Sequence, residues 1–88
     1  MFSVYMIRNS SGKLYVGITE DPRSRITHHN NKRGAQFTKY KPDFMIVFLE
    51  EYDSLSEART REIQIKKWRR EKKDVLITRY MQGLPTKQ

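Results

Sequence analysis

Side chains of the kind that bind or activate phosphate esters gather in the first part of the 88-residue chain. Tyr5 lies in the first apolar stretch and Tyr15 in the second, and Arg25 and His29 follow four residues apart. Arg forks onto phosphate oxygens, and nearby positive charge favours ionisation of a tyrosine whose ordinary pKa is about 10. Together with Glu62, these residues indicate phosphodiester cleavage. Each taken singly is also consistent with an ordinary strand aromatic, a surface charge or a helix-end cation.

Glu62 stands out because it interrupts the apolar stripe of a predicted helix. That helix opens at a capping box over residues 54–57, and its stripe consists of Leu55, Ala58 and Ile65. A carboxylate in such a stripe is costly to bury without a partner. Either the helix edge is exposed there, or Glu62 faces a cation or a metal. A lone carboxylate with waters and a substrate phosphate suits Mg²⁺.

The charge balance predicts a polyanionic partner. Eighteen Lys and Arg oppose ten Asp and Glu, which gives a net charge of +8, and nucleic acid is the first candidate. A basic surface kept for solubility is the alternative. Basic residues concentrate in 22–41 and 66–73, whereas acids gather between 50 and 57, and this segregation favours a binding surface. The candidate nucleic-acid contacts are Arg23, Lys32, Arg33, Lys66, Lys67, Arg69, Arg70, Lys72 and Lys73, and the candidate substrate-positioning residues are Gly17, Lys39 and Lys41.

The composition excludes several other functional classes. Without cysteine there is no disulfide, thiolate zinc site or thiol chemistry, and two adjacent histidines cannot form a multi-His metal cage. No apolar run reaches the roughly 18 residues of a membrane span, and the N-terminus does not follow a signal-peptide pattern. We therefore expect a cytoplasmic, monomeric protein that does not engage a membrane. It would form a single domain over residues 1–82 with a frayed tail at 83–88.

A β-hairpin is expected to bring the two tyrosines together. Residues 3–8 and 13–18 alternate as strands do, and residues 9–12 have turn composition. If Tyr5 lies opposite Tyr15, one face carries Tyr5, Ile7, Tyr15 and Gly17. The other face is then apolar and carries Val4, Met6, Leu14, Val16 and Ile18. A slip of one residue would separate the tyrosines.

The remaining pattern predicts one more strand and three helices. A helix begins at Asp21-Pro22 and runs to about residue 30, followed by an exposed basic loop over 31–43. The apolar run 44–49 indicates a central strand covered on both faces. After the helix that carries Glu62, a last helix over about 72–81 offers Val75, Leu76 and Tyr80 for packing. The order is β-β-α-β-α-α, an α/β protein of the α+β type.

The order of the candidate residues resembles that of the GIY-YIG nuclease domain, especially its small stand-alone members. The first motif appears as Ser3-Val4-Tyr5, of which only the Tyr is kept, and the second as Tyr15-Val16-Gly17. The family's Arg, ten residues after the second Tyr, falls on Arg25, the helix position one turn later on His29, and the later Glu on Glu62. Segments 34–38 and 66–68 also look like the small members, and the similarity covers roughly residues 3–77.

The resemblance implies a three-stranded antiparallel sheet flanked by helices. It also implies hydrolysis of DNA or RNA, with DNA favoured, using a divalent Mg²⁺ or Mn²⁺ held by Glu62. By analogy, Tyr15 is the likelier general base, Tyr5 places the water or the phosphate, and Arg25 stabilises charge at phosphorus. His29 would support that site, and Gly17 would leave room for substrate. A non-catalytic nucleic-acid-binding module is the alternative, and an adaptor for an acidic protein is a third hypothesis. The basic surface or a protein partner would supply targeting.

Overall fold

The computed structural model describes residues 1–36 and 43–87, with the backbone alone for residues 29 and 31–36. Its elements follow the predicted β-β-α-β-α-α order of an α+β fold, and all strand pairs are antiparallel. The strands are β1 (Phe2–Arg8), β2 (Leu14–Thr19) and β3 (Met45–Tyr52), and the helices are α1 (Pro22–Gln36), α2 (Leu55–Lys66) and α3 (Arg70–Met81). Helix α1 extends beyond its predicted end near residue 30, into the segment that was expected to be a loop.

The hairpin places both tyrosines on one face, but its register differs from the one expected. Tyr5 pairs with Gly17, and Ile7 pairs with Tyr15. The cause is the loop, where the Asn9 Oδ1 atom accepts hydrogen bonds from the backbone N–H groups of Ser11 (3.1 Å) and Lys13 (2.8 Å). This loop keeps five residues out of the ladder and so shifts the pairing by two residues. A two-residue shift leaves every side chain on its own face.

The sheet order is β2-β1-β3, so β1 is central and β3 is an edge strand. The prediction that the apolar run 44–49 forms the central strand was therefore wrong in position. Its side chains nevertheless pack on both sides, because Phe48 belongs to one apolar cluster, whereas Phe44 belongs to the other and Ile46 packs against it. A β-bulge between Met6 and Ile7 in the β1–β3 pairing interrupts the register there.

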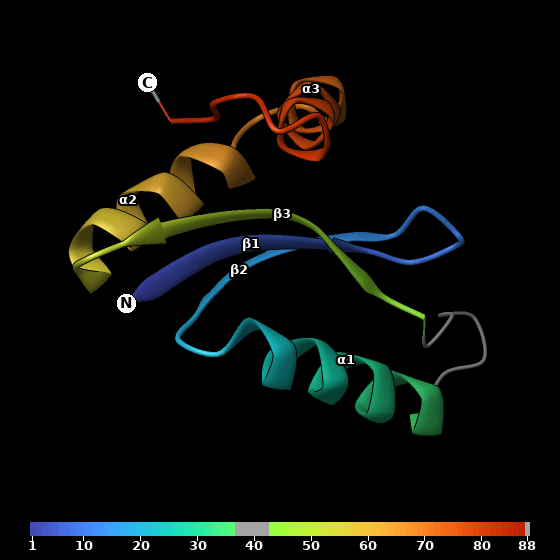
Figure 1. The fold of residues 1–88 in the computed structure, drawn as a ribbon. Helices are drawn as coiled ribbons and strands as arrows, with labels where there is room; N and C mark the ends of the chain where they lie inside the picture. Colours follow the sequence, from blue (N-terminus) through green and yellow to red (C-terminus); the bar gives the residue numbers. More distant parts are fainter. Residues whose placement is uncertain (37–42, 88) are drawn as a thin grey trace.

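The helices cover opposite faces of the sheet (Figure 1). Helices α2 and α3 lie on one side, over a core that includes the predicted Val4 and Met6 face of the hairpin. Helix α1 lies on the other side, the side of Tyr5 and Tyr15. The larger core is built from Val4, Met6, Val47, Phe48, Ala58, Ile65, Leu76 and Ile77.

Two predicted core positions are wrong. Leu55 is 44% exposed, because it is the first residue of α2 and follows the Ser54 cap directly. Val75 is 60% exposed, whereas Ile77 is buried beside Leu76 and takes its place in the core. Ser54 caps α2 as predicted, since the Glu57 N–H donates to Ser54 Oγ (3.2 Å), and the Glu57 carboxylate accepts from the Ser54 hydroxyl (3.0 Å) in place of the backbone N–H of a full capping box.

The C-terminal segment was expected to fray. In the structure it contacts α3 through Pro85 and β3 through Lys87. Gly83 adopts a positive φ of 73°, and the Leu84 N–H donates to the Arg79 carbonyl (2.9 Å), which ends α3 as in a Schellman motif. The Arg79 guanidinium donates to the Pro85 carbonyl (2.8 Å). Lys87 donates to the Glu51 carbonyl on β3. The chain therefore returns to the edge strand after its last helix.

Candidate active site

Tyr5 and Gly17 form the centre of the candidate site on adjacent strands. A Cβ atom built on Gly17 would lie 2.7 Å from the Tyr5 hydroxyl oxygen and 2.8 Å from its Cζ atom. The Tyr5 phenol therefore lies directly over the Gly17 backbone, which only glycine permits. The space that Gly17 leaves is occupied by Tyr5, which corrects the expectation that it is kept for substrate.

Two oppositely charged side chains act on the Tyr5 hydroxyl. Burial raises the pKa of Tyr5, the Arg25 guanidinium acts to lower this pKa, and the Glu62 carboxylate acts to raise it. The net pKa lies above the ordinary value of 10, so Tyr5 is a neutral phenol at physiological pH. Arg25 and Glu62 come from different helices, and the fold brings both within electrostatic reach of one phenol.

Tyr15 lies diagonally across the hairpin from Tyr5, on the same face. Its ring packs against Phe44 with a centroid distance of 5.5 Å, and the Lys13 ammonium lies 5.5 Å from the ring centroid. Tyr15 is only half-buried, whereas Tyr5 is 6% exposed. The two predicted catalytic tyrosines thus share a face but differ in their access to solvent.

Helix α1 presents Arg25 next to the tyrosine face. Asp21 caps the helix, since its carboxylate accepts from the Ser24 N–H (3.2 Å). Near the middle of the helix, Asn30 bonds both backbone groups of Phe44: its Oδ1 accepts from the Phe44 N–H (2.7 Å), and its Nδ2 donates to the Phe44 carbonyl (3.3 Å). Ile26 packs into the Tyr5 cluster, and the neighbouring Arg25 is left exposed.

A shallow pocket of about 310 Å³ opens beside Arg25, at the first turns of α1. His28 lines this pocket together with Arg25 and Asp21. The backbone of His29 lies on the same helix, but its side chain is outside the described part of the structure. The same holds for the side chains of Lys32 and Arg33, and Lys39 and Lys41 lie wholly outside the described residues.

Glu62, the carboxylate within the apolar stripe of α2, is paired with a cation. Its side chain is only 13% exposed, and its carboxylate contacts the Lys66 ammonium at 3.1 Å, one helical turn later. Glu62 therefore faces a cation, as one of the two sequence interpretations required. Lys66, predicted as a nucleic-acid contact, is that cation.

The donor set at Glu62 fits a hard divalent ion that keeps most of its water. Among the described side chains, no cluster of three or more His, Asp or Glu is close enough to form a protein cage for a metal. Mg²⁺ often binds through one or two carboxylates, with waters and substrate phosphates completing its shell. The single, largely buried Glu62 carboxylate is compatible with that mode of binding.

The predicted basic run 66–73 does not form one uniform surface. Lys66 pairs with Glu62, Arg70 pairs with Asp74 (3.1 Å), and the Lys72 ammonium lies 4.4 Å from the centroid of the Trp68 ring. Lys67 and Arg69 are exposed, as is Arg23 on α1, whereas Lys73 is half-buried. These placements agree with a basic surface in that region.

Sequence reasoning missed a buried ion pair on the other side of the sheet. Glu50, 4% exposed, receives two hydrogen bonds from the Arg61 guanidinium, at 2.9 and 3.2 Å, and one from the Tyr52 hydroxyl at 2.8 Å. The sequence had shown only that acidic residues gather between 50 and 57, with no partner assigned to any of them. The alternation of β3 carried the signal, because Phe48, Glu50 and Tyr52 occupy every second position and Phe48 is in the core.

This fold and site define the class of protein. The model of the GIY-YIG catalytic domain matches residues 1–75, and the chain belongs to this family. It is 40% identical over 75 residues to UPF0213 protein SSP2268 of Staphylococcus saprophyticus, which covers 85% of this chain and 92% of that protein. UPF0213 protein SA0446 of Staphylococcus aureus is 40% identical over 74 residues, 84% of this chain and 90% of that protein.

A solved structure agrees with the fold. The solution NMR structure of UPF0213 protein BH0048 from Bacillus halodurans matches with a TM-score of 0.57 and 32% identity, covering 89% of this chain and 84% of that one. Within the described part of the chain, none of the helices combines the length and apolar character that crossing a bilayer requires. The chain is thus a small GIY-YIG domain similar to the UPF0213 proteins.

Proposed function

We propose that the chain is a metal-dependent endonuclease that hydrolyses phosphodiester bonds in DNA. The strongest support is that the Tyr5 phenol, lying over Gly17, is within reach of both the Arg25 guanidinium and the Glu62 carboxylate. The Tyr5 hydroxyl is thereby close to a cation suited to bind phosphate, Arg25, and to an anion suited to bind a metal, Glu62. Membership of the GIY-YIG catalytic domain family supports the same reaction.

The difference in burial between the two tyrosines supports different roles for them. Tyr5, whose pKa is raised by burial, keeps its proton and donates a hydrogen bond to the attacking water or to the phosphate. Tyr15, which is half-buried and reachable by solvent, is the general base, and it takes the proton of the attacking water as the phenolate, having first released its own proton to solvent. Arg25, exposed beside them on α1, forks onto the phosphate oxygens and stabilises the charge that develops at phosphorus. His29, one turn later on the same helix, supports Arg25.

Glu62 is the residue that would hold Mg²⁺ or Mn²⁺. When bound there, the ion supplies positive charge that polarises the scissile phosphate and lowers the pKa of the attacking water. The exposed basic residues, with Lys39 and Lys41, hold the DNA backbone. The protein would act in the cytoplasm as a monomer, and the basic surface or a protein partner would select the site of cutting.

A cleavage assay on branched, flapped and single-stranded DNA and RNA tests this proposal. Tyr15→Phe, Arg25→Ala and Glu62→Gln should each lower metal-dependent cutting by about 100-fold or more, because each removes a proton acceptor, a phosphate ligand or a metal ligand. Binding to the same substrates should persist, since it depends mainly on the other basic residues.

Matched variants away from the site separate chemistry from folding. Tyr80→Phe, Arg59→Ala and Glu71→Gln make the same chemical changes on α2 and α3, and each should leave cutting within about two-fold of the parent. If no substrate is cut at any Mg²⁺ or Mn²⁺ concentration while salt-sensitive binding persists, the protein is a nucleic-acid-binding module and the enzyme proposal fails.

A further inference from the structure

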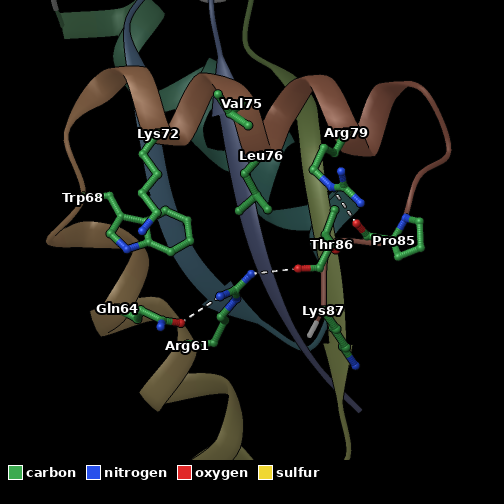
Figure 2. Close-up of a pocket in the computed structure, with 10 residues that line it drawn as sticks. All are labelled: Arg61, Gln64, Trp68, Lys72, Val75, Leu76, Arg79, Pro85, Thr86 and Lys87. Atoms are coloured by element: carbon green, nitrogen blue, oxygen red, sulfur yellow. Dashed lines mark hydrogen bonds between the residues drawn. The ribbon is translucent and has the colours of Figure 1, made fainter.

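A second pocket, of about 470 Å³, lies on the side of the sheet opposite α1 (Figure 2). It is enclosed by the end of α2, by α3 and by the C-terminal segment, with Trp68 at one end and Pro85 at the other. Its volume is within the range of small-molecule sites, roughly 300–1,000 Å³. None of the residues placed at the candidate active site lines it.

The lining of this Trp68 pocket is cationic. Arg61, Lys72, Arg79 and Lys87 line it, and its lining, as far as the structure describes it, contains no carboxylate. Arg61 is neutralised by Glu50, but within the described ranges no ion pair involves the other three cations. The pocket therefore holds positive charge that is not balanced locally, which favours an anionic ligand.

The floor of the pocket is fixed by the buried ion pair. Besides Glu50, the Arg61 guanidinium donates to Gln64 Oε1 (2.7 Å) and to the Thr86 carbonyl (3.1 Å), as Figure 2 shows. These bonds tie α2 to the C-terminal segment and hold the pocket open between them. Arg61 is thus committed to the structure, and a ligand would be held by the cations above it.

The remaining walls combine the flat Trp68 ring with charges at the ends of long lysine side chains. The Trp68 ring carries the Lys72 ammonium at 4.4 Å from its centroid, and Pro85 and Val75 add apolar surface. The Lys87 ammonium lies on another ring, 4.1 Å from the centroid of Tyr52. A ligand with both a flat ring and an anionic group could replace Lys72 on Trp68 and pair with the displaced ammonium.

We propose that the Trp68 pocket binds one nucleotide of a nucleic-acid strand. Its base stacks on Trp68, and its phosphate is held by Lys72 and Arg79. Base–aromatic stacking and charge-assisted phosphate contacts are the two terms that hold single strands on proteins. An acidic peptide would satisfy the cations and leave the Trp68 face unused. A strand also reaches the exposed Lys67 and Arg69 next to the pocket, which a free mononucleotide does not.

The choice of nucleic acid as partner rests on the proposed function, but the pocket does not depend on cutting. All binding is therefore measured in Glu62→Gln protein. Trp68 is the single tryptophan of the chain, so its fluorescence reports directly on this pocket. Titration with oligothymidylate should quench the Trp68 emission, whereas dTMP should quench it only at much higher concentration.

Charge-removing variants that keep a hydrogen-bond donor test the phosphate contacts. Lys72→Gln and Arg79→Gln should each weaken oligothymidylate binding by about ten-fold, and the Gln at 79 can still donate to the Pro85 carbonyl. Arg59→Gln removes one exposed charge outside the pocket lining, at a position not assigned to nucleic acid, and should weaken binding by about two-fold or less. Trp68→Leu, followed by anisotropy of a labelled oligonucleotide, should weaken binding by about ten-fold, and a thermal melt confirms that each variant folds.

The outcomes distinguish this proposal from the nuclease proposal. Binding seen by anisotropy without Trp68 quenching places the strand elsewhere and overturns the pocket, whether or not the parent protein cuts. Quenching by polyglutamate as strong as that by oligothymidylate identifies an acidic protein partner and also overturns it. A protein that does not cut but shows the expected quenching keeps the nucleotide pocket and loses the nuclease.

Discussion

Two carboxylate–cation pairs involve α2: Arg61 with Glu50 of β3, and Glu62 with Lys66. The two pairs differ in kind, although Arg61 and Glu62 are neighbours in the chain. On one side, Arg61 meets Glu50 with two hydrogen bonds, and the carboxylate is 4% exposed. On the other side, Glu62 meets one ammonium from Lys66, whose side chain is 54% exposed. The first pair is closed, because both partners are held by several bonds. The second is open to exchange, because its cation is flexible and solvated.

The difference explains why one pair is structural and the other suits chemistry. A buried, fully bonded pair gains nothing by changing partners and loses much if either is removed. A carboxylate that is largely buried but paired with a surface Lys can take a different cation at little cost, because that pair contributes little to stability. The same helix therefore supplies a rigid floor to the Trp68 pocket and, on the side of the candidate active site, a carboxylate whose partner is a solvated lysine.

The largest expected effect is the loss of the closed pair. Glu50→Ala should lower the free energy of unfolding by about 3–5 kcal/mol, because Arg61 is left charged and without its partner inside the protein. Glu62→Ala should lower it by less than about 1 kcal/mol. Urea denaturation followed by circular dichroism measures both, with the exposed Glu51→Ala as the control. Equal effects at positions 50 and 62 would remove the distinction between the two pairs.

The next effect tests the close contact at the centre of the candidate site. Gly17→Ala should cost about 1–3 kcal/mol, because the new Cβ would lie 2.7 Å from the Tyr5 hydroxyl oxygen and the phenol must move. It should also lower cutting, because Tyr5 moves relative to Arg25 and Glu62. Tyr5→Leu shortens the side chain over Gly17, so Gly17→Ala should cost much less in that background. An additive double-mutant cycle would mean that the two residues do not interfere as the structure indicates.

The smallest effect is the pH dependence of the closed pair. Burial acts to raise the pKa of Glu50, but hydrogen bonds from Arg61, Thr86 and Tyr52 outweigh it, and the net pKa is lowered from its ordinary value of 4.5. The folded state thus favours the carboxylate. Its contribution to stability is present above about pH 4.5 and is lost as the pH falls through the lowered pKa.

Unfolding free energies between about pH 3 and pH 7 measure this dependence in the parent and in Glu50→Gln. The parent should lose more stability than Glu50→Gln as the pH falls, because Gln does not titrate. Parallel curves would contradict the assignment. Burial likewise raises the pKa of Tyr52, to about 12, and its hydrogen bond to Glu50 adds to that shift. Stability should therefore also decline between pH 10 and about 12.

Most of the fold was predictable because its signals are local. Strand alternation put Tyr5 and Tyr15 on one face, and any even shift of register preserves that result. The cap at Ser54 depends on residues three apart and was predicted directly. The cost of burying a carboxylate left two interpretations of Glu62, an exposed helix edge or a facing cation, and the structure shows the cation: Lys66, its i,i+4 partner, which had been assigned to nucleic acid.

The sequence by itself therefore determined the family, the order of the elements and the identity of the candidate catalytic residues. Strand alternation, helix-capping residues and the spacing of the motif residues can all be recognised along the chain without knowing how it folds. Only the folded structure decided that Tyr5 lies over Gly17, because strand alternation is the same for every even register and does not say which residue of the partner strand the phenol covers. It also decided that Glu50 is buried against Arg61, because the partner of a buried charge comes from another element. The Trp68 pocket arises for the same reason, since α2, α3 and the C-terminal segment meet only after folding.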